Sequence, residues 1–237
     1  MRCGRYAAID IGTVTCRMLV VDVGESGLHE LTREYAITNL GEGVDATGEL
    51  KPEAMERAVR AIDGFLAVRD SLSTPDHPVI RTVAVATSAA RDARNAADFA
   101  ARLRERGIEL SVIPGAREAA LSFSGASIDF LRERLMVVDV GGGSTEVVMG
   151  MGGVEPVCAH SFNVGCRRVT EKFLQAIRCA RRACPGACVD SRENGLLVCR
   201  AVERSGGSRA RRCGCGNGHD RRQHSRSYGG LRFLTRP

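Results

Sequence analysis

The sequence contains no Trp, and aromatic residues make up only 4% of it. An oligonucleotide-binding surface built on stacked aromatic side chains is therefore not expected. No run approaches the roughly 18 consecutive apolar residues of a membrane-spanning helix, and the N-terminus lacks an apolar segment followed by a small-residue cleavage site. These absences predict a cytoplasmic protein with reduced thiols that binds neither a membrane nor a specific nucleic acid.

Lysine is also missing from the C-terminal part of the chain. Residues 176–237 carry 14 Arg, no Lys and four acidic residues, so their net charge is +10, whereas residues 1–175 carry about −4 of the total of +6. Six of the ten cysteines lie in the same C-terminal segment, and the other four are Cys3, Cys16, Cys158 and Cys166. The two parts of the chain therefore need separate explanations.

Apolar runs and helical periodicities alternate through the first 175 residues. Short apolar runs, most of them ended by Gly or Pro, predict strands over residues 6–11, 18–23, 79–86, 110–113, 135–140 and 146–149. Apolar residues at helical spacing predict helices over residues 53–68, 93–106 and 118–131, the first of which is entered through Pro52. This alternation predicts an α/β fold.

Two strand ends in this pattern are alike. Asp10 is followed by Ile-Gly-Thr-Val-Thr, and Asp139 is followed by Val-Gly-Gly-Gly-Ser-Thr. Such a repeat predicts two homologous lobes that face one ligand, although a tight turn between buried strands would explain either loop taken alone. Glycine lets the backbone point successive amides at a phosphate, and nearby hydroxyls add donors. The predicted phosphate-binding residues are Gly12, Thr13, Thr15, Gly141, Gly142, Gly143, Ser144 and Thr145.

Charged residues near these loops suggest hydrolysis of a phosphoanhydride. Asp10 and Asp139 end their strands, where a carboxylate suits Mg²⁺ that shares phosphate oxygens. Hydrolysis also needs a group that accepts a proton from water, and Glu118 is the candidate. An acid in the first turn of a helix would equally well favour the helix dipole. Arg91 is a candidate phosphate clamp, with a solvated surface side chain as the alternative.

Six segments, in this order along the chain, resemble the motifs of one enzyme family. They are residues 7–13, residues 40–43 with 47–48, residues 86–92 with Asn95, and residues 113–119, 139–146 and 164–171. Together they resemble the exopolyphosphatase and guanosine pentaphosphate phosphohydrolase family, Ppx/GppA. The sequence departs from the family at Val14, where Asn is usual, and at Asn39, where Arg is common.

The resemblance implies the fold of the acetate kinase, sugar kinase, Hsp70 and actin superfamily, with two ribonuclease-H-like lobes and the active site between them. Residues 1–125 would form the first lobe, and residues 126–175 would form the opening strands of an incomplete second lobe. The resemblance also implies that Glu118 activates the attacking water and that Arg91 contacts phosphate. It implies that Asp139 and Glu146 hold Mg²⁺, in addition to Asp10 suggested above.

The substrate implied by the family is inorganic polyphosphate or guanosine pentaphosphate, and two other functions stay open. An ATP-dependent kinase of the same superfamily would share the twin loops but should carry an acceptor pocket in place of Glu118. A non-catalytic remnant would bind nucleotides or alarmones without releasing phosphate. A homodimer like that of the family also stays open, although the altered second lobe argues against one for this chain.

The resemblance stops after residue 174, where the family expects a Gly-Thr-Ala-Thr phosphate loop. A reading frame shifted by one base over residues 213–223 permits Ala-Val-Ala-Gly-Thr-Ala-Thr-Thr-Val-Val. We therefore predict that residues 176–237 are out of frame and largely disordered. The alternatives are an Arg-rich tail that binds nucleic acid and a zinc site made by Cys213, Cys215, His219 and His224.

The frameshift hypothesis predicts a specific DNA sequence. The parent gene, read one base out of frame after residue 174, should continue with a family-like protein sequence that includes the missing loop. Sequencing that DNA tests the hypothesis, which fails if the shifted frame contains an early stop codon or no such loop.

Overall fold

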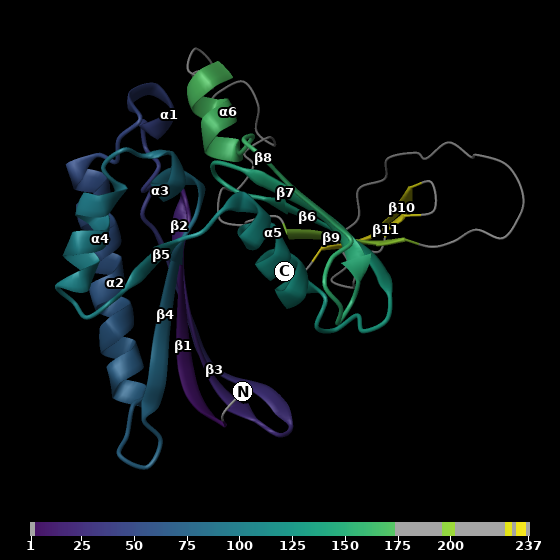
Figure 1. Ribbon diagram of the computed structural model, residues 1–237, viewed down its shortest axis with the longest axis horizontal. Coiled ribbons are helices and arrows are strands. Elements are labelled where there is room, and N and C mark those ends of the chain that lie inside the picture. Colours follow the sequence, from purple (N-terminus) through teal and green to yellow (C-terminus); the bar gives the residue numbers. More distant parts are fainter. Residues whose placement is uncertain (1–2, 174–195, 202–225, 229–230, 236–237) are drawn as a thin grey trace, which may run out of the picture.

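The computed structural model describes residues 3–173, 196–201, 226–228 and 231–235. Figure 1 shows two lobes side by side, each built on one sheet, with the two longer helices of the first lobe on the outer face of its sheet. None of the helices in the described part of the chain is both long enough and apolar enough to cross a membrane.

Within residues 3–173, the first lobe is built on a five-stranded sheet in the order β3-β2-β1-β4-β5. Its strands are β1 (Gly4–Ile11), β2 (Thr15–Gly24), β3 (Gly27–Ile37), β4 (Val79–Ala86) and β5 (Leu110–Val112). Strands β1 to β3 form an antiparallel meander, whereas β4 runs parallel to β1 and to β5. Strands β1 and β4 therefore end at the same edge of the sheet, which is where the first predicted phosphate loop lies.

Four helices complete the first lobe: α1 (Val44–Thr47), α2 (Pro52–Leu72), α3 (Ser88–Asp92) and α4 (Ala96–Arg104). The buried residues of α2 recur every three or four positions, so they form one face of the helix. This face packs on the alternate residues Ile9 and Ile11 of β1, and Phe99 of α4 is fully buried in the same cluster. Complete burial of such side chains contributes roughly 1.5–3 kcal/mol each, which fixes the strand ends that carry the loop.

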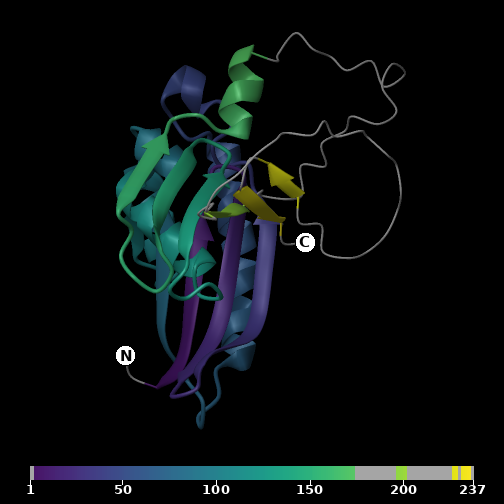
Figure 2. The same ribbon diagram turned by 90° about the vertical axis from the view of Figure 1, so that its right-hand side faces the viewer.

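Among the described residues, the second sheet has six strands in the order β10-β11-β9-β6-β7-β8. They are β6 (Arg134–Val140), β7 (Thr145–Met151), β8 (Cys158–Phe162), β9 (Leu196–Ala201), β10 (Arg226–Tyr228) and β11 (Leu231–Thr235). Helix α5 (Gly115–Ala126) packs Ala119 and Phe123 against the apolar side chains of β6 and β7. Helix α6 (Cys166–Phe173) follows β8 and lies beside α1 of the first lobe (Figure 1, Figure 2).

Several predicted boundaries are wrong. The helix predicted over residues 93–106 begins only at Ala96, because α3 occupies residues 88–92 and the chain is extended at Ala93. The helix predicted over residues 118–131 begins at Gly115, directly after Pro114, and ends at Ala126. Strands β3 and β8 and the short helices α1 and α3 were not predicted, because these segments lack a long apolar run or a helical periodicity.

Three strands, β9, β10 and β11, fall within residues 176–237, the segment predicted to be out of frame. The residues of the hypothetical zinc site, Cys213, Cys215, His219 and His224, lie outside the described residues. The frameshift, zinc and nucleic-acid hypotheses for this segment therefore stay predictions.

Candidate active site

A cleft of about 70 Å³ lies between the two lobes, where the β1–β2 turn meets the β6–β7 turn. Its walls are Asp10, Gly12, Thr13, Val14, Thr15, Arg17, Thr87, Glu118, Asp139, Gly141, Gly142, Gly143, Ser144 and Glu146. All the residues predicted for the site are among them, except Arg91 and Thr145. The structure therefore brings the two predicted loops and Glu118 to one place, as the internal repeat suggested.

The two loops have the same local geometry. Gly12 N donates to Thr15 O at 3.0 Å, and Gly141 N donates to Ser144 O at 2.9 Å. These matching hydrogen bonds close both turns and leave the amides between them available for a ligand. The second loop also packs closely against the first, because a Cβ added to Gly142 would lie 2.6 Å from Val14 Cγ2 and 3.0 Å from Thr13 Cβ. A glycine is therefore required where the two loops meet.

Three carboxylates come from the strands beside the loops. Asp10 lies near the end of β1, and Asp139 lies directly opposite Glu146 in the antiparallel pairing of β6 and β7. Glu146 is only 1% exposed, and Ser161 Oγ donates to its Oε1 at 2.7 Å. Ser122 Oγ of α5 donates to Asp139 Oδ2 at 2.7 Å. The acids are therefore held in fixed positions by strand pairing and by hydroxyl donors.

Two of these carboxyl groups, those of Asp10 and Glu146, resist ionisation. Burial raises the pKa of Asp10 and of Glu146, and the negative charge of Asp139 raises both further. Arg17, which pairs with Asp10 across the β1–β2 ladder, lowers the pKa of Asp10 and partly offsets this effect. The strand ends therefore concentrate negative charge that a bound cation would neutralise.

Glu118 reaches the cleft from the first turn of α5, and its side chain is 17% exposed. Burial raises its pKa to about 7, and the neighbouring charge of Glu146 adds to the rise, whereas a hydrogen bond from Arg91 opposes it. A carboxyl group with a pKa near neutrality suits general base or acid catalysis.

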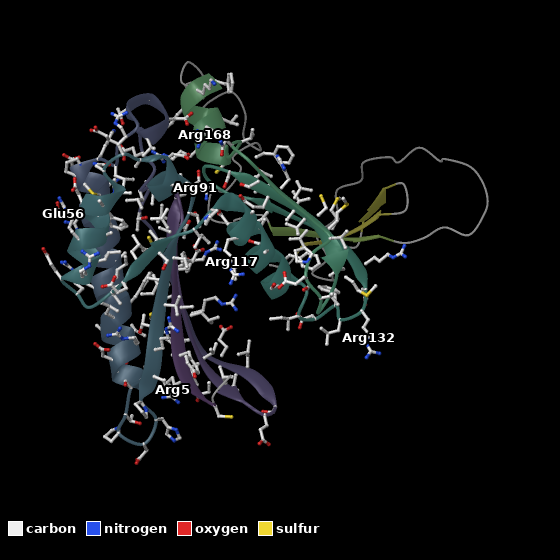
Figure 3. The ribbon with its side chains drawn as sticks, viewed as in Figure 1. Arg5, Glu56, Arg91, Arg117, Arg132 and Arg168 are labelled. Atoms are coloured by element: carbon white, nitrogen blue, oxygen red, sulfur yellow. The ribbon has the colours of Figure 1, made fainter. Side chains whose placement is uncertain are left out.

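Arg91 extends from α3 toward α5 (Figure 3). Its Nη1 donates to Glu118 Oε2 at 3.2 Å and to the carbonyl of Ile113 at 3.0 Å. The guanidinium is thus engaged with Glu118 and with the strand end before α5, and its contact with phosphate stays a prediction. Thr145 donates to the carbonyl of Val164 behind the loop, so its phosphate contact also stays a prediction.

The donor set fits Mg²⁺. Among the described residues, no group of three or more His, Cys, Asp and Glu side chains is arranged to hold a metal ion by itself. Mg²⁺ in phosphate-binding enzymes usually takes one or two carboxylates, keeps several waters and shares oxygens with the substrate. Asp10 and Asp139, one from each lobe, both line the cleft and offer hard oxygen ligands of this kind.

Three residues that line the cleft were not predicted: Val14, Arg17 and Thr87. Arg17 lies two positions after Thr15 on the same strand, so strand alternation alone places both side chains on one face. The sequence alone could therefore have placed Arg17 at the cleft. Thr87 follows the end of β4, and its place beside the cleft depends on the parallel pairing of β4 with β1.

Glu118 provides a test of this electrostatic description. Its pKa in the folded protein is higher than in the unfolded chain, so the ionised form costs stability, and this cost grows as the pH rises from about 4.5 to about 7. Glu118→Gln should therefore stabilise the metal-free protein at pH 8 by on the order of 1–3 kcal/mol more than at pH 5.

Urea unfolding in the presence of a chelator measures this difference. Glu155→Gln, on an exposed loop, serves as the control and should show little dependence on pH. An equal effect of Glu118→Gln at both pH values would contradict the raised pKa.

Known proteins resemble this chain in sequence and in structure. It is 41% identical over 184 residues to exopolyphosphatase 2 of Mycobacterium tuberculosis, covering 73% of this chain and 56% of that protein. An exopolyphosphatase structure from Cytophaga hutchinsonii has a TM-score of 0.66 and 31% identity, covering 71% of this chain and 53% of the other. The Aquifex aeolicus member of the Ppx/GppA family has a TM-score of 0.61 and 32% identity, covering 73% and 55%.

The chain therefore spans about half the length of these relatives. The structural matches confirm that the chain has the α/β fold of solved Ppx/GppA relatives. The Ppx/GppA phosphatase family model matches residues 19–183. With the twin glycine loops and Glu118 at one interlobe cleft, and with this match over most of its length, the chain belongs to the Ppx/GppA phosphatase family.

Proposed function

We propose that this protein is a phosphohydrolase that removes the terminal phosphate of inorganic polyphosphate or of guanosine pentaphosphate. The observation that carries this proposal is the position of Glu118, a carboxyl group with a pKa of about 7, in the cleft that both glycine loops line. The relatives named exopolyphosphatases support a phosphoanhydride as the substrate class. The cytoplasmic location predicted from the sequence stays a prediction.

The two loops would bind the terminal phosphate. The amides of Gly142, Gly143 and Ser144 in the second loop and the hydroxyls of Thr13 and Thr15 in the first would supply the donors, since all five residues line the cleft. Neutral donors from both lobes would orient the phosphoryl group so that the bridging oxygen leaves in line with the incoming water. Because the cleft is small, about 70 Å³, it suits one phosphate group better than a larger part of the substrate.

Asp10 and Asp139 would hold Mg²⁺, with Glu146 beside Asp139. The ion would neutralise charge on the phosphate oxygens, which the negatively charged carboxylates cannot do. Ser122 and Ser161, which donate to Asp139 and Glu146, would keep the carboxylates aimed at the ion.

Glu118 would accept a proton from water as the water oxygen attacks the terminal phosphorus. The bond between that phosphorus and the bridging oxygen breaks, and the shortened chain leaves as an anion. Arg91 would orient Glu118 through the hydrogen bond between them. A kinase would need an acceptor pocket at this point, and the carboxyl group of Glu118 stands there instead.

Binding without hydrolysis is the second candidate function. The two glycine loops line the cleft whether or not Glu118 acts as a base. The chain spans about half the length of these relatives, so their activity is a proposal for it. Such a protein would bind a nucleoside polyphosphate between the loops and release no phosphate.

Glu118→Gln separates these functions. If Glu118 is the base, the substitution should lower phosphate release from polyphosphate and guanosine pentaphosphate by about 10²- to 10⁴-fold, while substrate binding is retained. Phosphate release by the wild-type chain, Glu118→Gln and the control Glu155→Gln is compared by a colorimetric assay. Equal rates for all three would exclude Glu118 as the base, and a wild-type chain that binds without releasing phosphate would support the second candidate.

The Mg²⁺ proposal has a separate test. Asp139→Asn removes one charged ligand, so the Mg²⁺ concentration needed for half-maximal thermal stabilisation should rise by about tenfold or more. Asp76→Asn, at an exposed position of the loop before β4, should leave it unchanged. If Mg²⁺ stabilises the Asp139→Asn protein as well as it stabilises the wild type, Asp139 is not a ligand.

A further inference from the structure

Residues 164–171 resemble a family motif, yet they do not line the cleft and have no part in the mechanism proposed above. Helix α6 begins in this segment and is bonded directly to the second glycine loop. Cys166 N donates to Gly141 O at 3.0 Å, and Arg167 N donates to Gly142 O at 2.9 Å. A Cβ on Gly165 would overlap the carbonyl group of Gly142, so the segment and the loop are in backbone contact. The start of α6 and the second loop therefore form one unit.

Arg168 connects this unit to the first lobe. Its Nε donates to Gly143 O of the second loop at 2.9 Å. Its Nη2 donates to Asp92 Oδ2, at the end of α3, at 2.6 Å, and its Nη1 donates to Asp45 of α1. The side chains of Arg168, Asp45 and Asp92 are 22–30% exposed, and one guanidinium bridges three segments of the chain. Figure 3 places Arg168 on α6, beside the helices of the first lobe.

Two further hydrogen bonds connect α6 to the first lobe. Arg167 Nη1 donates to Asn39 Oδ1 at 2.7 Å, and Glu171 Oε1 accepts from Gly43 N at 3.3 Å. Both partners belong to the segment between β3 and α1, and Asp45, the partner of Arg168, lies just beyond this segment in α1. Helix α6 therefore contacts residues 39–45 through three side chains.

The contacted segment in turn holds the first phosphate loop. Asn39 N donates to Val14 O at 2.9 Å, and Gly41 N donates to Thr13 O at 2.8 Å. A continuous series of hydrogen bonds thus runs from the second loop through α6 and residues 39–45 to the first loop. Thr13 and Gly143 line both the catalytic cleft and the recess that contains Arg168, so the bridge lies directly behind the cleft.

We propose that Arg168 is a positioning residue, which holds the two phosphate loops at the separation at which one terminal phosphate contacts both. It acts through Gly143 O, Asp45 and Asp92 and does not touch the substrate. The substrate part of this inference rests on the proposed function, whereas the coupling between the loops does not. Ordinary surface ion pairs contribute little, but hydrogen bonds to a charged group that is mostly buried contribute more.

Without the bridge, a phosphate would have to bring the loops together as it binds. Arg168→Ala should therefore weaken the binding of tripolyphosphate about tenfold, and in an active chain KM should rise more than kcat falls. Asp45→Asn, which keeps the size of its side chain, should have a smaller effect in the same direction. Arg168→Lys should lie between wild type and Arg168→Ala, because it keeps the charge but only part of the hydrogen bonding.

The experiment combines calorimetric titration with tripolyphosphate and hydrogen–deuterium exchange of the free protein. In Arg168→Ala and Asp45→Asn, exchange should become faster in both residues 38–46 and residues 139–145. Arg60→Ala is the matched control, because it removes an exposed ion pair with Glu56 within the first lobe, and it should change neither loop.

Faster exchange in both loops in the two bridge variants, with weaker tripolyphosphate binding, supports the proposal. Exchange and affinity equal to those of Arg60→Ala in both variants would overturn it. If Arg168→Ala does not fold, Asp45→Asn decides the question alone. Because exchange is measured without substrate, a chain that releases no phosphate contradicts the proposed function but leaves the coupling of the loops open to measurement.

Discussion

The close approach of two glycine loops from different lobes is the constraint on which the rest of the site depends. Each loop is closed by the same hydrogen bond between positions i and i+3, and Gly142 lies against Thr13 without room for a side chain. Phosphate recognition by backbone amides requires such an approach, because amides reach only as far as a hydrogen bond. The strand pairings and the buried core of each lobe position the loops, and α6 links them from behind.

The same approach creates an electrostatic problem. Asp10 and Asp139 end their strands at the loops, and Glu146 and Glu118 complete a group of acids around one small cleft. Burial and mutual repulsion raise the pKa of three of them, Asp10, Glu118 and Glu146. Arg17 and Arg91 offset only part of this repulsion. If a divalent cation binds here with a phosphate, as we propose, it would relieve this unfavourable charge density.

Arginine has a different role on each side of the cleft. Arg91 donates one hydrogen bond to Glu118, whereas Arg168 donates to three acceptors behind the loops. These acceptors are one backbone carbonyl and two carboxylates. Lysine could not replace Arg168, because a single ammonium group cannot present donors in three directions of one plane. The guanidinium thus acts as a structural connector as well as a charge, in addition to the contacts that Arg167 and Glu171 make with the first lobe.

Much of the site could be predicted from the sequence, because its main features are local. The Asp-x-Gly units at two strand ends, and Glu118 after a strand-ending turn, are short patterns whose geometry depends on neighbouring residues, and the structure places them at one cleft. Helix boundaries were less accurate. The sequence shows helical spacing over residues 93–106, whereas in the structure α3 occupies residues 88–92 and extended backbone at Ala93 separates it from α4, which begins at Ala96.

By itself, then, the sequence indicated the two glycine loops and the acids beside them, since each follows from spacing within a few residues. The repeat of the loops and the family resemblance indicated the two lobes. Only the tertiary structure decided that Glu118 has a pKa near 7, that Arg91 bonds to it and that Arg168 bridges Asp45, Asp92 and Gly143. The reason is physical: burial, charge repulsion and hydrogen bonding depend on distances between groups that lie far apart along the chain, and no local pattern specifies those distances.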